Sequence, residues 1–399
     1  TASVLIFVKG RGIVLKEPSL VAMDILTDEV IAVGDEAAPM VGRAPERIRV
    51  VRPPRDGVIS DYRGTEIMLK HFLKKIMGRG ALSAPRLVIC VPSGVTEVEK
   101  QSVRLAVRDA GVRKVRLVEE PVAAAIGASP EEVYFTSGGT EADNWAVKGV
   151  AAASRKKGDH IITSAIEHHA VLHPCRALEK QGYRVTYLPV DEFGRVEPGD
   201  VEDAITDETI LVSVMAANNE IGSIQPVAEI GRIAHDHNVP FHTDAVQAIG
   251  AFSVGVDAMG ADLLALSAHK FGGPKGTGAL YVRRGTRIGT FMDGGAQERG
   301  RRAGTENVPG IVGMGVACRL AEEEAEATRS GVGVDKLKAY LEAGIRDRIP
   351  DIRVNSPEDS CPSILNVSFL GCRGEVLLHA LESDGIYVST GSACSSHKK

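Results

Sequence analysis

The chain has 399 residues, of which 44% are hydrophobic and 25% charged, and its formal net charge at pH 7 is −5. This length allows two or three domains with ample cores, and no apolar run is long enough to span a bilayer. The absence of a basic stripe argues against nucleic-acid binding. Without a charged and then apolar signal segment, the expected location is the cytoplasm.

The first 128 residues differ from the rest in charge. They hold 20 Lys and Arg against 15 Asp and Glu, whereas the remaining residues hold 27 against 37. Apolar runs with strand character alternate with helical patterns, which predicts an α/β segment. The expected strands lie at 3–8, 20–25, 86–91 and 114–118, and the expected helices lie at roughly 62–78 and 95–110.

This first segment resembles MreB, the bacterial actin-like filament protein, in the runs KGRGIVLKEPSLVAMD, RPPRDGVISDY, RLVICVPSGVTEVEKQSV and VRLVEEPVAAAIGA. The resemblance implies a partial actin-like α/β fragment at residues 1–128, with Glu119 or Glu120 as the family's water-positioning glutamate. Only Thr1-Ala2 remains of the first phosphate loop, and Leu82-Ser83 stands where the family has an apolar membrane-inserting pair. We therefore expect neither ATP binding nor that membrane contact from this segment.

A glycine turn joins an expected strand to an expected helix at residues 134–144. The backbone N–H groups of Gly139 and Thr140, with the threonine hydroxyl and the helix N-terminus, suit a phosphate. An ordinary strand-to-helix loop is the alternative. Further on, His168 follows an expected strand at 161–164, where an imidazole can stack on a planar ring, move protons or cap a helix.

Two later apolar strands lead to Asp244 and Lys270. Since the carboxyl ends of successive parallel strands share one edge of an open α/β sheet, both groups are expected at the edge where such sheets bind ligands. A lysine amine buried there has a lowered pKa and becomes a nucleophile. A pyridoxal phosphate (PLP) enzyme needs such an amine for its Schiff base and a carboxylate against the pyridine nitrogen. The alternatives are a solvated lysine and a helix-capping aspartate.

From about Ser129 to Lys399 the sequence resembles the NifS/IscS-type cysteine desulfurases, which are class-V aminotransferases of PLP fold type I. The matching motifs, in the family's order, are FTSGGTEADN, EHHAV, NNEIG, HTDAVQ, SAHKFGGPKGTGALYVRR, ERGRRAGTEN and STGSACSS. The resemblance implies an α/β fold with a mostly parallel central sheet flanked by helices.

The same resemblance implies a role for each matched residue. Lys270 would hold PLP, Asp244 would pair with the pyridine nitrogen, and His168 would stack on the ring. Asn219 and Gln247 would bind the oxygen side of the ring. The phosphate would be held by Gly139, Thr140, Ser267 and His269, and Thr305 would reach the phosphate of the partner subunit in a homodimer.

Cys394 lies among small and polar residues in the run STGSACSS, so we expect a mobile segment. The resemblance implies that this thiol takes the sulfur of L-cysteine, which leaves L-alanine and a persulfide on Cys394. The sulfur would then pass to an iron–sulfur scaffold protein or a thiolation partner. A free thiol near a frayed end is the alternative.

The remaining cysteines and a group of histidines give no metal site. No pair among Cys90, Cys175, Cys318, Cys361 and Cys372 has CxxC spacing, so we expect inert thiols in a reducing compartment. His235, His237 and His242 are close in sequence, but no acidic or thiol partner stands out as a further ligand. We interpret them as helix-end and strand residues.

Three domains are expected: an MreB-like fragment at 1–128, a PLP-binding large domain at 129–328 and a truncated small α+β domain at 329–399 that carries the Cys394 loop. The two resemblances meet within residues 124–132, without a Gly, Ser or Pro linker. We therefore expect a fusion of two unrelated proteins. By the resemblance, the family's N-terminal arm and the arginine that clamps the substrate carboxylate lie outside this chain, which predicts impaired turnover.

Three functions follow as alternatives. The chain is a PLP-dependent cysteine desulfurase, an actin-like cytoskeletal fragment acting through residues 1–128, or a fusion that binds PLP with impaired catalysis.

Overall fold

The computed structural model describes residues 3–8, 12–27, 29–55, 58–59, 62–77, 86–91, 97–109, 112, 114–119, 121–329 and 333–390. The chain forms two compact units, Thr1–Pro121 and Val122–Lys399. The units therefore divide at Pro121, whereas the two family resemblances meet near Ala128.

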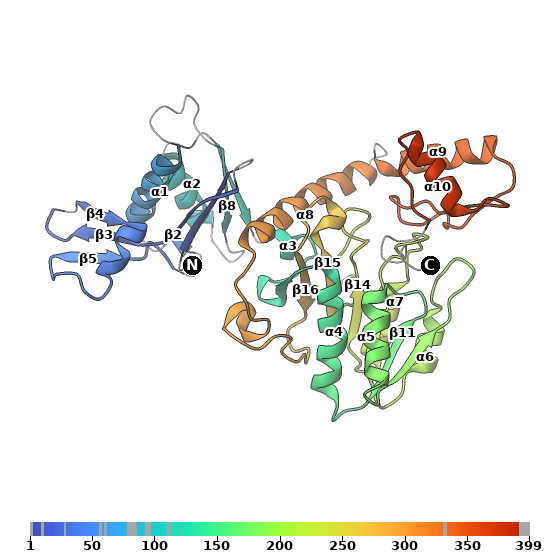
Figure 1. Ribbon diagram of the computed structural model, residues 1–399. Helices are drawn as coiled ribbons and strands as arrows, with labels where there is room; N and C mark the ends of the chain where they lie inside the picture. The colour runs from blue at the N-terminus through green and yellow to red at the C-terminus, as the bar shows by residue number, and fades with distance from the viewer. Residues whose placement is uncertain are drawn as a thin grey trace. The chain divides into compact units, whose positions relative to one another are not determined.

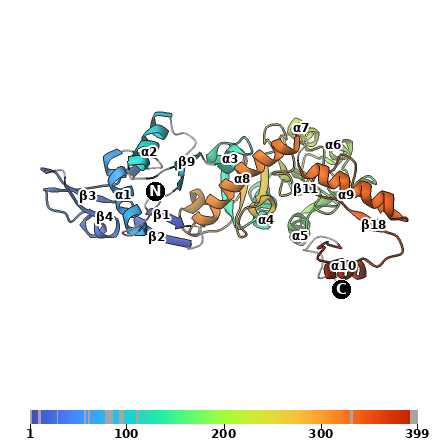
Figure 2. The ribbon, with the colours of Figure 1, turned by 90° about the horizontal axis from the view of Figure 1, so that it is seen from above.

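The first unit is built from small sheets and two main helices. Its strands are β1 Ser3–Val8, β2 Gly12–Pro18, β3 Val21–Asp24, β4 Val30–Val33, β5 Ile48–Val51, β6 Pro54–Arg55, β7 Val58–Ile59, β8 Arg86–Val91 and β9 Lys114–Glu119. Helices α1 (Tyr62–Met77) and α2 (Glu97–Asp109) lie side by side (Figure 2). Strands β8 and β9 are parallel and α2 connects them. The α/β alternation predicted for this segment is thereby confirmed.

Several expectations for the first unit concern residues that the structure does not describe. Thr1, Ala2, Leu82, Ser83 and Glu120 lie outside the described residues. Glu119 is described only as the last residue of β9.

The second unit contains a seven-stranded sheet in the order β10-β16-β15-β14-β13-β11-β12. Every strand except β16 runs in the same direction. The strands are β10 Val133–Thr136, β11 His160–Ser164, β12 Arg184–Leu188, β13 Thr209–Ser213, β14 Phe241–Asp244, β15 Leu263–Ser267 and β16 Gly278–Val282. The predicted fold, a mostly parallel sheet flanked by helices, is confirmed.

Helices cover both faces of this sheet. They are α3 Pro121–Ala124, α4 Gly139–Ser154, α5 His169–Glu179, α6 Pro198–Ala204, α7 Val227–Asp236 and α8 Val308–Arg329. Figure 1 shows α4 and α5 side by side along the sheet.

Strand residues of the sheet alternate between two buried cores. Leu211 and Leu263 pack with the fully buried Trp145 of α4, whereas Val212 and Leu264 pack on the opposite face with Ile230 of α7. A parallel sheet buried on both faces needs this continuous apolar character. One consequence matters for the site: every second residue at a strand end faces α4.

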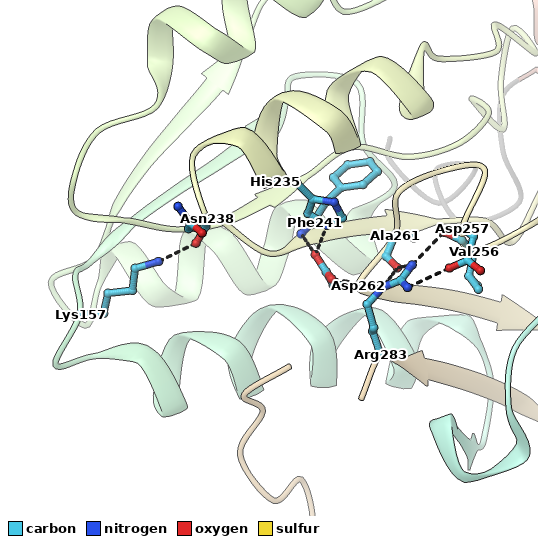
Figure 3. Close-up of polar contacts among 9 residues, drawn as sticks. All are labelled: Lys157, His235, Asn238, Phe241, Val256, Asp257, Ala261, Asp262 and Arg283. Carbon is cyan, nitrogen blue, oxygen red and sulfur yellow. Dashed lines mark hydrogen bonds and ion pairs between the residues drawn. The ribbon is translucent and has the colours of Figure 1, made fainter. Parts of the chain in front are cut away.

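Asp262, just before β15, fixes the edge of the sheet where β14 and β15 begin (Figure 3). Its Oδ2 accepts a hydrogen bond from the Phe241 N–H at 2.9 Å and lies 2.9 Å from Nε2 of His235. Arg283 lies 3.4 Å from Oδ1 of Asp262 and donates to Asp257 at 2.8 Å. Because these charges are satisfied among themselves, this edge is structural, and the opposite edge is left for ligands.

The last part of the second unit contains α9 (Val334–Arg348), α10 (Gly374–Ser383) and the antiparallel pair β17 (Ile352–Val354) and β18 (Val367–Phe369). No residue of α9 or α10 is buried, and Tyr340 and Val376 are largely exposed. Within the described part of the chain, no helix is both long and apolar enough to cross a membrane.

Candidate active site

The predicted site residues gather at one edge of the seven-stranded sheet. Asp244 is the last residue of β14, and Lys270 lies in the short 3₁₀ helix Ala268–Phe271 that directly follows β15. Strands β14 and β15 are parallel neighbours. His168 precedes α5 after β11, and Gly139 begins α4 after β10. The structure therefore brings four separate chain segments to the carboxyl ends of the strands.

Asp244 is a buried carboxylate, only 5% exposed. Its Oδ1 accepts a hydrogen bond from the Val246 N–H at 2.9 Å. Burial raises the pKa of Asp244 to about 6, although this bond and the positive charge of Lys270 act in the opposite direction. A cation placed against this carboxylate would therefore favour its ionised form further.

Lys270 differs from the expectation in one respect. The sequence predicted a buried amine at a strand end, which is wrong, because Lys270 is exposed. The chain leaves β15 through a 3₁₀ turn that ends at Gly272 with φ of +80°, and the Gly273 N–H bonds to the carbonyl of Ala268 at 2.8 Å. This tight turn carries Lys270 out of the core, while its charge still lowers the pKa of His168, Asp244 and His269.

The start of α4 has the features of an anion site. Gly138 caps the helix with φ of +157° and no side-chain bond to the helix N–H groups. A Cβ on Gly139 would lie 2.6 Å from Cγ2 of Val246, so only glycine fits there. Ser267 lies against Gly139, and its hydroxyl is 2.9 Å from Nδ1 of His269. The start of a 16-residue helix thus lies beside a hydroxyl that in turn contacts an imidazole.

His168 is the N-cap of α5, and its Nδ1 accepts the Ala170 N–H at 3.1 Å. Burial and then the charge of Lys270 lower the pKa of His168. The imidazole is therefore neutral near pH 7, with its proton on Nε2. Capping, one of the three roles considered from sequence, is confirmed, and stacking on a ring stays a prediction.

The other predicted residues lie around this edge. Asn219 and Gln247 are half-buried, and Thr140 and Thr305 are exposed. Arg302 contacts Glu141 on α4 at 2.7 Å, which ties the segment before Thr305 to the first turn of that helix.

The C-terminal segment packs on the loop that carries Asn219. The Cys361 N–H bonds to the Gly222 carbonyl at 2.7 Å, and Asn366 donates to the Glu220 carbonyl at 3.1 Å. The thiol of Cys361 is 3.8 Å from the carbonyl oxygen of Gln247. Cys394 lies outside the described residues.

A cavity of about 330 Å³ opens beside Thr140 and His168. Asn144, Lys148 and His173 also line it, together with Ala170 and Pro174, so polar and basic side chains stand beside apolar ones. A larger cavity of about 740 Å³ is lined by residues of α6, α7 and Asp359 and contains none of the predicted site residues. The smaller cavity is therefore the candidate site, because it lies beside the predicted residues at the strand ends, although the other cavity is larger.

Two buried acids in this region were not singled out from the sequence. Asp143 is 1% exposed and Glu167 is 5% exposed. Asp143 sits on the apolar stripe of α4 with Ala146, Val147 and Val150, and an acid in such a stripe is a signal that the sequence contained. Oε1 of Glu167 accepts from the Met215 N–H at 2.8 Å and from the hydroxyl of Ser164 at 2.7 Å.

Glu167 predicts a pH dependence of stability. Burial raises its pKa from 4.5 to about 8, so between these values the folded protein holds a proton that the unfolded chain lacks. Stability is therefore fully present below pH 4.5 and falls as the pH rises to about 8. In Glu167→Gln the free energy of unfolding should no longer show this decrease, which is a few kcal/mol in the parent protein. Urea unfolding across this range measures it; the exposed Glu202→Gln is the control, and parallel curves for all three proteins would contradict it.

Comparisons with known proteins agree with this geometry. The model of the aminotransferase class-V family matches residues 101–399, and that of the MreB/Mbl protein family matches residues 1–138. The chain is 54% identical over 287 residues to a cysteine desulfurase IscS of Clostridium botulinum, covering 71% of this chain and 72% of that protein.

Two solved structures are also similar. One is a NifS-like protein with a TM-score of 0.65 and 43% identity, covering 68% of this chain and 74% of that chain. The other is SspA in complex with cysteine, with a TM-score of 0.60 and 32% identity over 82% of this chain and 86% of that chain.

Proposed function

The chain belongs to the class-V aminotransferases and, within them, to the IscS-type cysteine desulfurases, and from this we propose that it binds PLP through Lys270 and removes sulfur from L-cysteine. The observation that carries the proposal is the meeting of Asp244, His168 and Lys270 at one edge of the sheet. The charge of Lys270 acts on both other groups. The similar structure of SspA holds cysteine, which supports this amino acid as the substrate.

The residues present fit PLP chemically. The buried carboxylate of Asp244 suits a protonated pyridine nitrogen, since a cation offsets the cost of its burial. The α4 N-terminus, Ser267 and His269 suit the phosphate. When bound, PLP supplies an electron sink for the carbon atoms of the substrate.

The remaining contacts complete the proposed site. His168 presents a neutral imidazole to the ring, and Asn219 and Gln247 bind its oxygen side. Gly139 and Thr140 bind the phosphate, and the exposed Thr305 reaches the phosphate of the second subunit in a homodimer. The Arg302–Glu141 pair holds the segment of Thr305 near α4.

Cys394 receives the sulfur. The C–S bond of L-cysteine breaks and an S–S bond forms between its sulfur and Cys394. Cys394 loses its thiol hydrogen as a proton, and the former C–S carbon gains one proton to become the methyl group of L-alanine. The product on the protein is a persulfide, which an iron–sulfur scaffold or thiolation protein then takes up. Cys175, Cys318, Cys361 and Cys372 are free thiols, which supports a reducing, cytoplasmic location.

The proposal is tested with the purified chain, PLP, L-cysteine and a thiol reductant. We expect a visible Schiff-base absorption band and equal amounts of alanine and sulfide. A band without alanine would support the alternative of a fusion that binds PLP with impaired catalysis. Absence of both the band and the products would overturn the proposed function.

A further inference from the structure

Three buried carboxylic acids near the candidate site lie close enough together for their charges to act on one another. They come from three elements: Asp143 from α4, Glu167 from the loop before α5, and Asp244 from the end of β14. Each is at most 5% exposed. At most one of three neighbouring buried acids can ionise at a low cost in free energy. Each further negative charge would have to overcome both the loss of solvation and the repulsion of the first charge.

A histidine lies at the base of this group. His242 is two residues before Asp244 on β14, so both side chains point to the face covered by α4. Nε2 of His242 is 3.5 Å from Oδ1 of Asp143, and both residues are at most 1% exposed. Among the described residues, neither of these two atoms has a hydrogen-bond partner. The other ring nitrogen, Nδ1, is 2.8 Å from the hydroxyl of Ser213.

The pKa shifts of the two residues indicate that a proton lies between Oδ1 of Asp143 and Nε2 of His242. Burial, together with the charges of Asp244 and Glu167, raises the pKa of Asp143 well above its ordinary value. Burial lowers the pKa of His242 to about 3, so the imidazole is a neutral acceptor. The pKa of Glu167 is about 8 and that of Asp244 about 6, with the charge of Lys270 favouring ionised Asp244. The single negative charge of the group therefore belongs on Asp244.

We propose that Asp143 and His242 share one proton behind Asp244 and act as positioning residues that leave the Asp244 carboxylate free for the pyridine nitrogen of PLP. This inference rests on the proposed function. If His242 loses its imidazole, the proton of Asp143 has the neighbouring carboxylate of Asp244 as its remaining acceptor. The Asp244 carboxylate would then accept a hydrogen bond from Asp143, and its own hydrogen bond to the pyridine nitrogen would weaken.

The test compares the full-length chain with His242→Leu and with the double variant Asp143→Leu/His242→Leu. The dissociation constant of PLP is measured by fluorescence, and the protonation of the pyridine nitrogen is read by NMR with ¹⁵N-labelled PLP. We expect His242→Leu to weaken PLP binding roughly tenfold, the scale of one buried polar group left without its partner, and to shift the ¹⁵N resonance towards the unprotonated form. The double variant removes the competing proton as well, so both readouts should return towards the parent values.

The outcomes separate this inference from a structural role and from the proposed function. If the two residues only pack the core, the double variant binds PLP no better than His242→Leu, and the inference is overturned. Equal binding by the parent and His242→Leu overturns it too. Asp143→Asn, whose amide can donate to His242, should keep the parent ¹⁵N shift, and this second variant decides the matter if His242→Leu does not fold. Failure of the parent chain to bind PLP would overturn the proposed function and this inference together.

Discussion

Replacing Lys270 with alanine should abolish the covalent capture of PLP and, with it, the turnover of L-cysteine. The amine lies directly after β15, beside the strand that ends in Asp244. Lys270 is the first lysine after β15 and lies in the 3₁₀ turn that directly follows the strand, whereas Lys275 comes later in the same connection to β16. Loss of an essential covalent group typically costs on the order of 10³-fold or more in rate. Loss of the Schiff-base absorption band and of alanine formation are the two measurements.

Lys275→Ala is the matched control for this change. Lys275 is exposed in the glycine-rich turn after Lys270, and its charge also lowers the pKa of His269. Removing Lys275 therefore removes a nearby positive charge without removing the Schiff-base amine. We expect Lys275→Ala to keep the absorption band. A Lys270→Ala protein that retains the band, or a Lys275→Ala protein that loses it, would contradict the assignment.

The apo protein offers a second measurement of the Lys270 position. The charge of Lys270 lowers the pKa of His168, so Lys270→Ala should raise the pKa of His168 in an NMR titration. An unchanged titration of His168 would mean that the amine does not reach the site. Because no cofactor is involved, this measurement separates the position of the amine from its reactivity.

The strand ends of this protein could be predicted from local sequence. Asp244 and Lys270 each follow a short apolar run, and the parallel arrangement of such runs places their ends at one edge of the sheet. The exposure of Lys270 could not be predicted in this way. It depends on the 3₁₀ turn and the backbone bond from Gly273 to Ala268, which the residue pattern does not specify.

Contacts between distant segments explain the other omissions. Asp143 and His242 are about a hundred residues apart, and only the packing of α4 on β14 brings them to 3.5 Å. The backbone hydrogen bond from the Cys361 N–H to the Gly222 carbonyl likewise joins the C-terminal segment to the loop that carries Asn219. Neither contact leaves a local pattern in the chain, although the acid in the apolar stripe of α4 marks Asp143 by itself. His242 is a strand residue, as its sequence pattern predicts, but its proposed role depends on Asp143, which lies on another element.

Replacing Cys394 with alanine should abolish sulfide release while PLP binding remains. Of Cys175, Cys318, Cys361 and Cys372, only Cys372 is exposed enough to accept sulfur in place of Cys394. Cys175, Cys318 and Cys361 are buried, and burial raises the pKa of Cys175 to about 12, so its thiolate is scarce. Cys372, in contrast, is an exposed thiol and therefore the matched control.

The two cysteine variants separate sulfur acceptance from general thiol chemistry. Cys372→Ala should release sulfide at the parent rate, whereas Cys394→Ala should fall by roughly a hundredfold or more, as expected when a nucleophile is lost. Mass spectrometry after one turnover with ³⁴S-labelled cysteine should find the added sulfur on the peptide that contains Cys394. If the label appears on Cys372 instead, an exposed thiol of the second unit accepts the sulfur, which contradicts the assignment to Cys394. Sulfide release that persists in both single variants and stops in the double variant would show two interchangeable acceptors and contradict the assignment to Cys394.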